Sequence, residues 1–446
     1  MLSIGIDFGT SNSSVAVFDG ARVRLLAIDR HARNPQVMRS LLYIPRDGDI
    51  VAGQRALDLY TEQNTGREVK LERYSLGEIE MTFSDMTVIK EAYAMIDVNE
   101  PGRLFQSLKR FLAVTSFKRT NVFGRDYRLE ELVATLARQM LLAAEGALDQ
   151  RIDRLVVGRP VHFSEDAAKD EAARERLAEA WSIAGVSQVR FLEEPVAAAK
   201  HYAAVVQLAP GSRTIVFDFG GGTLDVSLVH ATSGGAEVPA TGGVPIGGDL
   251  MDSRIMETRI ARRFGRGARY QTDDLPVPSH IFSRLRSWQT IVELNRPQQL
   301  EIIHKAQREA DQPRELAALE ALVTRNYGLA LFRAIEEAKI ALSTEEDATV
   351  RLHHDPIDLD EPLSREEFEA TIGPQIHAAR QCTLGVVRSA GCEPEQIDVV
   401  LTTGGSSLIP AFRRMLADAL PNATLTEADT FTSVAAGLAL AGAEGW

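Results

Sequence analysis

Two distant segments of the chain repeat one pattern. Residues 5–15 read Gly-Ile-Asp-Phe-Gly-Thr-Ser-Asn-Ser-Ser-Val, and residues 216–226 read Val-Phe-Asp-Phe-Gly-Gly-Gly-Thr-Leu-Asp-Val. Each predicts a β-hairpin: an apolar strand that ends in an aspartate, a glycine turn with hydroxyl residues, and a second strand. The repetition predicts two halves of similar design that face each other.

The residue types of the two hairpins suit a polyphosphate and a metal ion. Glycine lets the backbone turn tightly and approach a ligand, and successive amides in such a turn bind anions. Thr10 and Thr223 can add hydroxyl donors. An aspartate beside a phosphate chain needs a cation between them, and Mg²⁺ is typically held by one or two carboxylates plus phosphate oxygens. Asp7 and Asp218 are therefore the first candidates for Mg²⁺ ligands.

Composition limits the classes of function. A chain of 446 residues predicts at least two domains. The net charge of −13 argues against nucleic-acid and anionic-membrane binding, which need a positive surface. No signal peptide is apparent, and no apolar run approaches the roughly 18 residues of a membrane span. With two cysteines in no metal or disulfide pattern, we expect a cytoplasmic protein.

Periodicity and turn signals predict several further elements. The expected helices cover residues 129–148, from a cap at Ser164 toward Gly185, from Glu194 onward, and 435–443. The expected strands cover residues 155–160 and 397–402, and residues 45–125 are of mixed character. Residues 260–335 predict a helical stretch interrupted at Pro297 and Pro313. The chain has no Gly-Lys dipeptide, which excludes a Walker-type phosphate loop.

Six segments, in chain order, resemble the nucleotide-binding domain of the DnaK-type heat-shock chaperones, within the actin and sugar-kinase superfamily. They are residues 6–10, 192–199, 218–225, 246–254, 337–343 and 403–406. The second glycine hairpin and the segment Leu-Glu-Glu-Pro-Val-Ala-Ala-Ala at 192–199 carry the resemblance most clearly. Over its whole length, with Val-Gly-Arg-Pro-Val-His-Phe at 157–163, the chain is most similar to the short YegD-like members.

The resemblance implies an α/β, actin-like ATPase fold with two lobes, each with a ribonuclease-H-like mixed sheet flanked by helices, plus helical insertions. Lobe I would span residues 1–211, with 425–446 returning to it and 41–124 as its smaller subdomain. Lobe II would span residues 212–424, with 247–362 as its smaller, enlarged helical subdomain. Because the chain stops at residue 446, no peptide-binding domain is expected.

The resemblance also implies roles for individual residues. Lys109 would reach the γ-phosphate, and Glu194 would orient the attacking water or accept its proton. Asp218 and Thr223 would share in catalysis. On its sequence alone, Lys109 is typical of a solvated lysine and Glu194 of a charge at a helix start. The other residues implied to contact the nucleotide are Gly9, Thr10, Ser11, Asn12, Gly220, Gly221, Gly222, Gly247, Gly248, Glu336, Lys339, Ser343, Gly404, Gly405, Ser406 and Leu408. The implied ligands are ATP or ADP and Mg²⁺, with K⁺ as a further candidate ion.

The chain departs from the family pattern in three places. Leu408 stands where the family has an arginine that stacks on adenine, which predicts an apolar base contact. Ala168 replaces an arginine tied to interdomain signalling. More residues separate Asp252 from Glu336 than in the family, which indicates an insertion.

The function expected from the resemblance is slow ATP hydrolysis that drives lobe closure in a chaperone-like protein. Two alternatives stay open at this point: a small-molecule kinase of the same fold, and an ATP-dependent, actin-like scaffold without significant catalysis. A protein client or co-chaperone could dock on residues 260–335. This stretch carries Ile281, Phe282, Leu285, Trp288, Ile291 and Leu294 at helical spacing. These side chains could equally serve only to fill an enlarged lobe.

Overall fold

The computed structural model describes residues 2–83, 86–206, 211–232, 235–427 and 433–445. The chain divides into two compact units. Unit 1 comprises Met1–Leu59, Arg103–Leu250 and Ile372–Trp446, and unit 2 comprises Tyr60–Gly102 and Met251–Thr371. The predicted lobe boundaries stay a prediction, and residues 428–432 and 446 of the predicted return segment lie outside the described residues.

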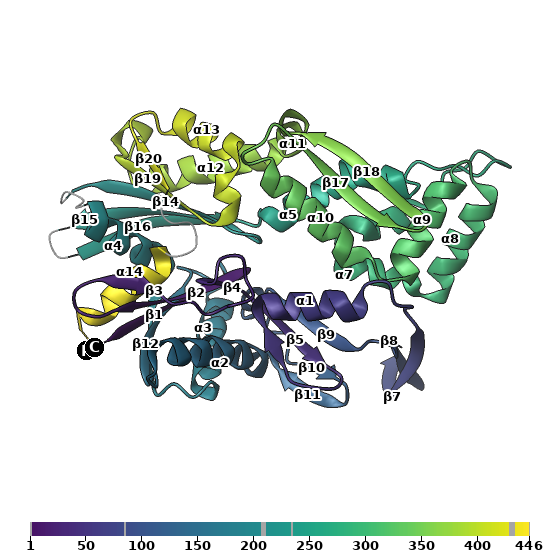
Figure 1. The fold of residues 1–446 in the computed structure, drawn as a ribbon, viewed down its shortest axis with the longest axis horizontal. Helices are drawn as coiled ribbons and strands as arrows, with labels where there is room; N and C mark the ends of the chain where they lie inside the picture. The colour runs from purple at the N-terminus through teal and green to yellow at the C-terminus, as the bar shows by residue number, and fades with distance from the viewer. Residues whose placement is uncertain (1, 84–85, 207–210, 233–234, 428–432, 446) are drawn as a thin grey trace. The chain divides into compact units, whose positions relative to one another are not determined.

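Unit 1 contains two mixed sheets of the same topology (Figure 1). The first has the order β13-β12-β1-β2-β3, with β4 paired to β2, and the second has the order β16-β15-β14-β19-β20. The first sheet consists of β1 (Ser3–Phe8), β2 (Asn12–Phe18), β3 (Val23–Leu25), β4 (Val37–Arg39), β12 (Arg154–Arg159) and β13 (Gln188–Glu193). The second consists of β14 (Arg213–Phe219), β15 (Leu224–Thr232), β16 (Gly235–Val244), β19 (Val399–Thr403) and β20 (Thr424–Glu427).

The same pairing recurs at the centre of both sheets. Strand β1 is antiparallel to β2 and parallel to β12. Strand β14 is likewise antiparallel to β15 and parallel to β19. The two predicted glycine hairpins, β1–β2 and β14–β15, therefore occupy equivalent places in the two sheets.

Helices of unit 1 pack on the faces of these sheets. The helices α2 (Leu129–Leu148) and α3 (Ala167–Ile183) share a core with the first sheet, because Ile4, Ile6 and Phe8 of β1 point toward them. The helices α12 (Gly373–Ser389) and α13 (Pro410–Ala419) belong to the second sheet, where Phe412 meets Phe219 edge to face.

Two alanine-rich helices, α4 (Glu194–Val206) and α14 (Ser433–Ala443), join the two sheets through one apolar core. This core includes Val156 of the first sheet and Val216 of the second. The helices cross closely at Gly437, where a Cβ atom would collide with the carbonyl oxygen of Ala197. Small side chains are therefore required at this crossing, and the predicted helix over residues 435–443 is confirmed.

The remaining elements of unit 1 are short, and some continue into unit 2. They are β5 (Leu41–Pro45), β6 (Val51–Ala52), α1 (Gly53–Asn64), β9 (Gly102–Gln106), the 3₁₀ turn η1 (Leu108–Phe111), β10 (Arg119–Val122), β11 (Arg125–Arg128), α5 (Gly248–Ile255), η6 (Pro394–Gln396) and η7 (Gly405–Leu408). In the described part of the chain, no helix is long and apolar enough to cross a membrane.

Several predicted elements of unit 1 are confirmed with small shifts at their ends. The helix predicted over residues 129–148 has those bounds. The helix predicted from a cap at Ser164 begins two residues later than that cap implies, because Asp166 caps it by accepting from the amides of Ala168 and Lys169. The strand predicted over residues 397–402 runs from Val399 to Thr403.

Unit 2 is built from two hairpins and a group of short helices. Its elements are β7 (Leu71–Phe83), β8 (Met86–Asp97), the π-helical turn η2 (Met256–Ile260), η3 (Ala261–Phe264), α6 (Ser279–Ser283), η4 (Arg284–Arg286), α7 (Trp288–Ile291), η5 (Val292–Asn295), α8 (Pro297–Glu309), α9 (Pro313–Thr324), α10 (Gly328–Ala341), β17 (Asp347–His354), β18 (Ile357–Ser364) and α11 (Arg365–Thr371). The hairpin β7–β8 lies in the stretch that the sequence predicted only as mixed.

The stretch predicted as helical over residues 260–335 consists of short helices and helical turns, apart from residues 265–278 and brief connections, and it is interrupted at Pro297 and Pro313 as predicted. Pro297 and Pro313 are the first residues of α8 and α9. Proline suits this position, because its missing N–H would have no partner in the first turn. The apolar side chains at 281, 282, 285, 291 and 294 are buried, while Trp288 is half-buried and packs near Tyr60.

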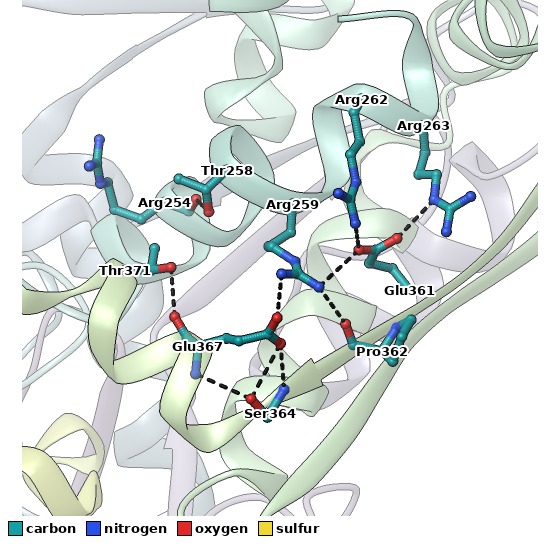
Figure 2. A network of polar contacts seen from close by, with 10 residues as sticks. All are labelled: Arg254, Thr258, Arg259, Arg262, Arg263, Glu361, Pro362, Ser364, Glu367 and Thr371. Atoms are coloured by element: carbon teal, nitrogen blue, oxygen red, sulfur yellow. Dashed lines mark hydrogen bonds and ion pairs between the residues drawn. The ribbon is translucent and has the colours of Figure 1, made fainter.

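An ion-pair network in unit 2 centres on Glu361 of β18 (Figure 2). This carboxylate is only 1 % exposed, and Arg259, Arg262 and Arg263 all contact it. Arg259 also donates to Glu367, at 2.7 Å, and to the carbonyl oxygen of Pro362, at 3.2 Å. The network therefore ties the helical turns η2 and η3, which follow α5, to the hairpin β17–β18.

Candidate functional site

The two glycine hairpins present their aspartates in the same way. Asp7 lies next to the end of β1 opposite Ser14, and Asp218 lies next to the end of β14 opposite Asp225. Both strands are buried along most of their length, so the half-buried aspartates stand at the edge of an apolar sheet. The hairpins predicted from the sequence are thus present with a carboxylate at each edge.

The turns of the two hairpins contact each other within unit 1. We call residues 9–11 the first turn and residues 220–223 the second turn. Ser11 of the first turn lies so close to Gly221 of the second that a Cβ atom there would collide with its Oγ. Ser40 fixes the first turn, because its Oγ donates to the carbonyl oxygen of Gly9 and its amide to that of Ser11, both at 2.8 Å. The following residue, Asn12, begins β2.

Two further glycine motifs converge on the second turn. At the start of α5, the amide of Gly248 donates to Gly220 O at 3.2 Å, and that of Asp249 donates to Gly221 O at 2.8 Å. Ser406 of η7 donates through its Oγ to Gly220 O at 2.8 Å. The preceding Gly404 has φ of +78°, a conformation that favours glycine. Gly247 lies directly against Gly221 of the second turn. Gly405 and Leu408 lie in η7.

A lysine and a glutamate form a buried ion pair beside the aspartates. Lys109 comes from η1 and Glu194 from the first position of α4. Their Nζ and Oε1 atoms are 2.5 Å apart, and the side chains are 8 % and 14 % exposed. The fold therefore brings together the two residues implied as the cation and the water-positioning carboxylate.

The carboxylates at this site carry more negative charge than the protein compensates. Displacement of water and the charge of Glu194 raise the pKa of Asp7 to about 7, although Lys109 lowers it. Displacement of water, with Glu194, Asp225 and Asp7, raises the pKa of Asp218 well above its usual value. Burial alone would lower the pKa of Lys109, but Glu194 and Asp7 outweigh it and raise this pKa. Lys109 therefore stays charged, but its single charge does not offset the burial of the aspartates and their repulsion by neighbouring carboxylates.

The donor set fits Mg²⁺. Hard oxygen ligands from one or two carboxylates are what this ion takes from a protein, and its charge would relieve the repulsion between Asp7 and Asp218. Asp225 adds a third carboxylate that the sequence reasoning did not assign. Thr223 donates to Asp225 at 2.9 Å, and the pKa of Asp225 is raised to about 6 by the displacement of water, with Glu194 adding to the rise. The signal for Asp225 was available in its cross-strand position opposite Asp218.

These pKa shifts predict a pH dependence of stability without metal. Between about pH 4 and pH 7 the folded protein holds a proton on Asp7 that the unfolded chain releases, so the free energy of unfolding should rise as the pH falls through this window. Urea unfolding in EDTA at pH 5 and pH 8 measures this rise, which Asp7→Asn should reduce. Mg²⁺ competes with the proton, so added Mg²⁺ and ATP should raise the melting temperature more at pH 8 than at pH 6. An equal pH dependence in the wild type and in Asp7→Asn would contradict the assignment.

The residues predicted to contact adenosine fall into both units. Gly404, Gly405, Ser406 and Leu408 belong to unit 1, whereas Glu336, Lys339 and Ser343 belong to unit 2 on and just after α10. Within unit 2, the Nζ atom of Lys339 forms an ion pair with Asp252, 2.8 Å from Oδ1, and both side chains are largely buried. The convergence of the two groups on one adenosine stays a prediction.

Comparison with known proteins identifies the family of the chain. A family model described as "Hsp70 protein" matches residues 3–287 and 321–443. The chain is 28 % identical over 428 residues to heat shock 70 kDa protein BIP3 of Oryza sativa. The aligned region covers 93 % of this chain and 52 % of that protein. It is 26 % identical over 427 residues to the chaperone protein DnaK of Thermus thermophilus, covering 94 % of this chain and 57 % of DnaK. The chain thus spans about half the length of these relatives. The family model leaves residues 288–320 unmatched, and they lie in the stretch where an insertion was predicted.

Proposed function

Because the chain belongs to the Hsp70 protein family and has its actin-like ATPase fold, we propose that unit 1 binds ATP with Mg²⁺ at the two glycine turns. We further propose that it hydrolyses ATP slowly to ADP and phosphate. The observation that carries the proposal is the buried Lys109–Glu194 pair beside Asp7 and Asp218. A buried cation among several carboxylates at two glycine turns suits a phosphate chain that arrives with its own metal.

The chemistry assigned to these residues is a simple displacement. A water oxygen attacks the γ-phosphorus, the bond from that phosphorus to the bridging oxygen breaks, and the proton of the water passes to a carboxylate of the protein. In this proposal Glu194 accepts that proton and Lys109 neutralises the phosphoryl oxygens, and their mutual contact supports a shared site. Mg²⁺ would neutralise the phosphate chain and hold it in place. When the γ-phosphate binds, Lys109 can exchange Glu194 for a phosphate oxygen, which frees this carboxylate for the water.

Phosphate release by the purified protein tests this function. With ATP and Mg²⁺ but no added acceptor, we expect slow, continuous release of orthophosphate. ADP formation that starts only when an acceptor such as a sugar is added would favour a kinase. Tight ATP binding without release would favour a scaffold. Either result would contradict the ATPase proposal.

Beyond the nucleotide, we propose a chaperone-related role in which a protein client or co-chaperone contacts residues 260–335. This role rests on the family, since the relatives are named as chaperones and the chain spans about half their length. The apolar residues first considered for docking are mostly buried in unit 2, so the contact surface would consist of other side chains of this stretch. The cytoplasmic location and the lack of nucleic-acid binding stay predictions.

Hydrogen exchange tests the coupling of this stretch to the nucleotide. We expect amides in residues 260–335 to differ in protection between the ATP and ADP states. The stretch follows α5, whose first amides donate to the second turn, and leads into α10, which carries the predicted adenosine contacts. The comparison uses the whole chain with Mg²⁺ and saturating nucleotide. Residues 129–148 serve as an internal reference, since α2 is a buried helix remote in sequence from both motifs. Identical protection of 260–335 in the two states would leave this stretch only its role in packing.

A further inference from the structure

A second cation lies beside the second turn, directly after Lys109. Arg110 belongs to the same 3₁₀ turn, η1, and its amide donates to Ser107 O at 3.0 Å. Ser107 has φ of +58°, which is uncommon for a residue with a side chain. The backbone here is thus held in an unusual conformation that directs Lys109 and Arg110 as a pair.

The C-terminal side of this turn is fixed from α3. Arg176 donates to the carbonyl oxygens of Leu112 at 3.1 Å and Phe117 at 2.7 Å, and forms an ion pair with Glu130 at 2.5 Å. Arg176 is 14 % exposed and Glu130 is 9 % exposed. Buried, charge-assisted hydrogen bonds of this kind restrict the backbone that follows η1. The backbone that carries Arg110 is therefore held on both sides.

The side chain of Arg110 lies against the second turn. A Cβ atom at Gly222 would stand 3.2 Å from Arg110 Cδ, 3.4 Å from Nη1 and 3.5 Å from Nε. The separation from Cδ is tighter than an ordinary contact and those from the two nitrogens are ordinary contacts, so the Arg110 side chain lies directly against Gly222. The guanidinium thus lies next to the backbone of the turn, one residue before Thr223.

Arg110 is a donor without an acceptor. Its side chain is exposed, and within the described ranges its guanidinium has no hydrogen-bond or ion-pair partner. This contrasts with Lys109, its neighbour, which is buried and paired with Glu194. A guanidinium offers five N–H donors in a planar fork that matches the oxygens of a phosphate group. Held beside the amides of a glycine turn, it completes a set of donors for an anion with several oxygens.

We propose that Arg110 binds the terminal phosphate of the nucleoside triphosphate and thereby makes the site prefer ATP over ADP. The proposal rests on the proposed function, because it assigns a residue to that same site. The terminal phosphate is the one concerned because Arg110 adjoins Lys109, whose partner Glu194 is the carboxylate assigned to the attacking water. Thr223, the residue after Gly222, carries one of the hydroxyl groups assigned to the phosphates.

Binding of two nucleotides to matched variants tests this assignment. The probes are ADP and the non-hydrolysable β,γ-imido analogue of ATP, titrated calorimetrically with Mg²⁺ in excess. Arg110→Ala should weaken binding of the analogue about tenfold, in line with the loss of a charge-assisted hydrogen bond, and should leave ADP binding within about twofold. Arg110→Lys should keep part of the preference, because it retains the charge without the fork. Arg119→Ala is the control: Arg119 is an exposed arginine of unit 1 whose side chain has no ion-pair partner in the described part of the chain, and both affinities should be unchanged.

A second variant moves Arg110 without removing it. In Gly222→Ala the added methyl group would push the Arg110 side chain away by a few tenths of an ångström, so this variant should show a smaller loss of the same selective kind. The double variant should lose no more than the larger single loss, because both changes remove one interaction. An unchanged ratio of the two affinities in Arg110→Ala, or an equal loss for both nucleotides, would overturn the proposal while leaving the proposed function intact. Failure of the wild type to bind either nucleotide would overturn both.

Discussion

Replacing Lys109 by methionine should lower the rate constant of ATP hydrolysis by about a hundredfold or more. The reason is the environment of its ammonium group. This group is buried in an ion pair with Glu194, and the negative charges of Asp7 and Asp218 also act on it. A cation at this position neutralises charge that moves during phosphoryl transfer, whereas much of the ATP is held elsewhere by the turn amides and the metal. The loss should therefore appear mainly in the rate constant of a single turnover and only weakly in ATP affinity.

The matched control for this variant is Lys118→Met. Lys118 is an exposed lysine of the same unit, and its removal should leave hydrolysis unchanged. Thermal melts of both variants with EDTA show whether folding is preserved, since Lys109→Met leaves Glu194 buried without its cation. Equal losses of affinity and of rate constant would mean that Lys109 acts as a uniform binding contact, and no loss of rate would remove it from the site.

Replacing Glu361 by alanine should lower the free energy of unfolding by about 3 kcal/mol. The carboxylate is 1 % exposed and serves three arginines, with Arg263 Nε at 2.8 Å from its Oε2 (Figure 2). Removal of this carboxylate leaves the three arginines close together without the buried anion that they share. Arg262 and Arg263 are about half exposed and can recover hydration, so the expected loss stands at the low end for a buried ion pair.

Glu367→Ala is the control for the Glu361 variant. Glu367 also pairs with Arg259, at 2.7 Å, but is 46 % exposed, and its removal should cost less than about 1 kcal/mol. Urea denaturation followed by circular dichroism gives both values from the shift of the midpoint at a constant slope. A loss in Glu361→Ala no larger than in Glu367→Ala would mean that burial of this carboxylate has no energetic consequence.

Features set by local sequence could be predicted well. The paired hairpins follow from an apolar strand, an aspartate and a glycine turn, and the helix over residues 129–148 follows from its apolar spacing. Shifts at element ends arose where two residues could play the same role. Both Ser164 and Asp166 are good caps, and the structure uses Asp166 for α3. The interruptions at Pro297 and Pro313 could be predicted, because proline cannot continue a helix but suits its first turn.

Features that depend on distant contacts could not be predicted from residue patterns. Lys109 and Glu194 lie 85 residues apart, and neither has a local signature that separates it from an ordinary surface charge. Only the family resemblance pointed to them. The apolar residues between 281 and 294 have helical spacing, yet the chain there forms several short turns that bury five of the six side chains discussed for docking. Their common burial reflects packing in unit 2, which spacing alone could not separate from an exposed face.

The central claim is that one ATP and one Mg²⁺ are held jointly by the two glycine hairpins. Calorimetric titration of the β,γ-imido ATP analogue, with Mg²⁺ and with EDTA, measures this most directly in the wild type and in Asp7→Asn and Asp218→Asn. We predict one nucleotide per chain, bound more tightly with Mg²⁺, and a loss of this Mg²⁺ dependence in each variant, because either carboxylate alone is an incomplete ligand set. Binding that is independent of Mg²⁺ in the wild type, or that keeps its Mg²⁺ dependence in both variants, would contradict the account.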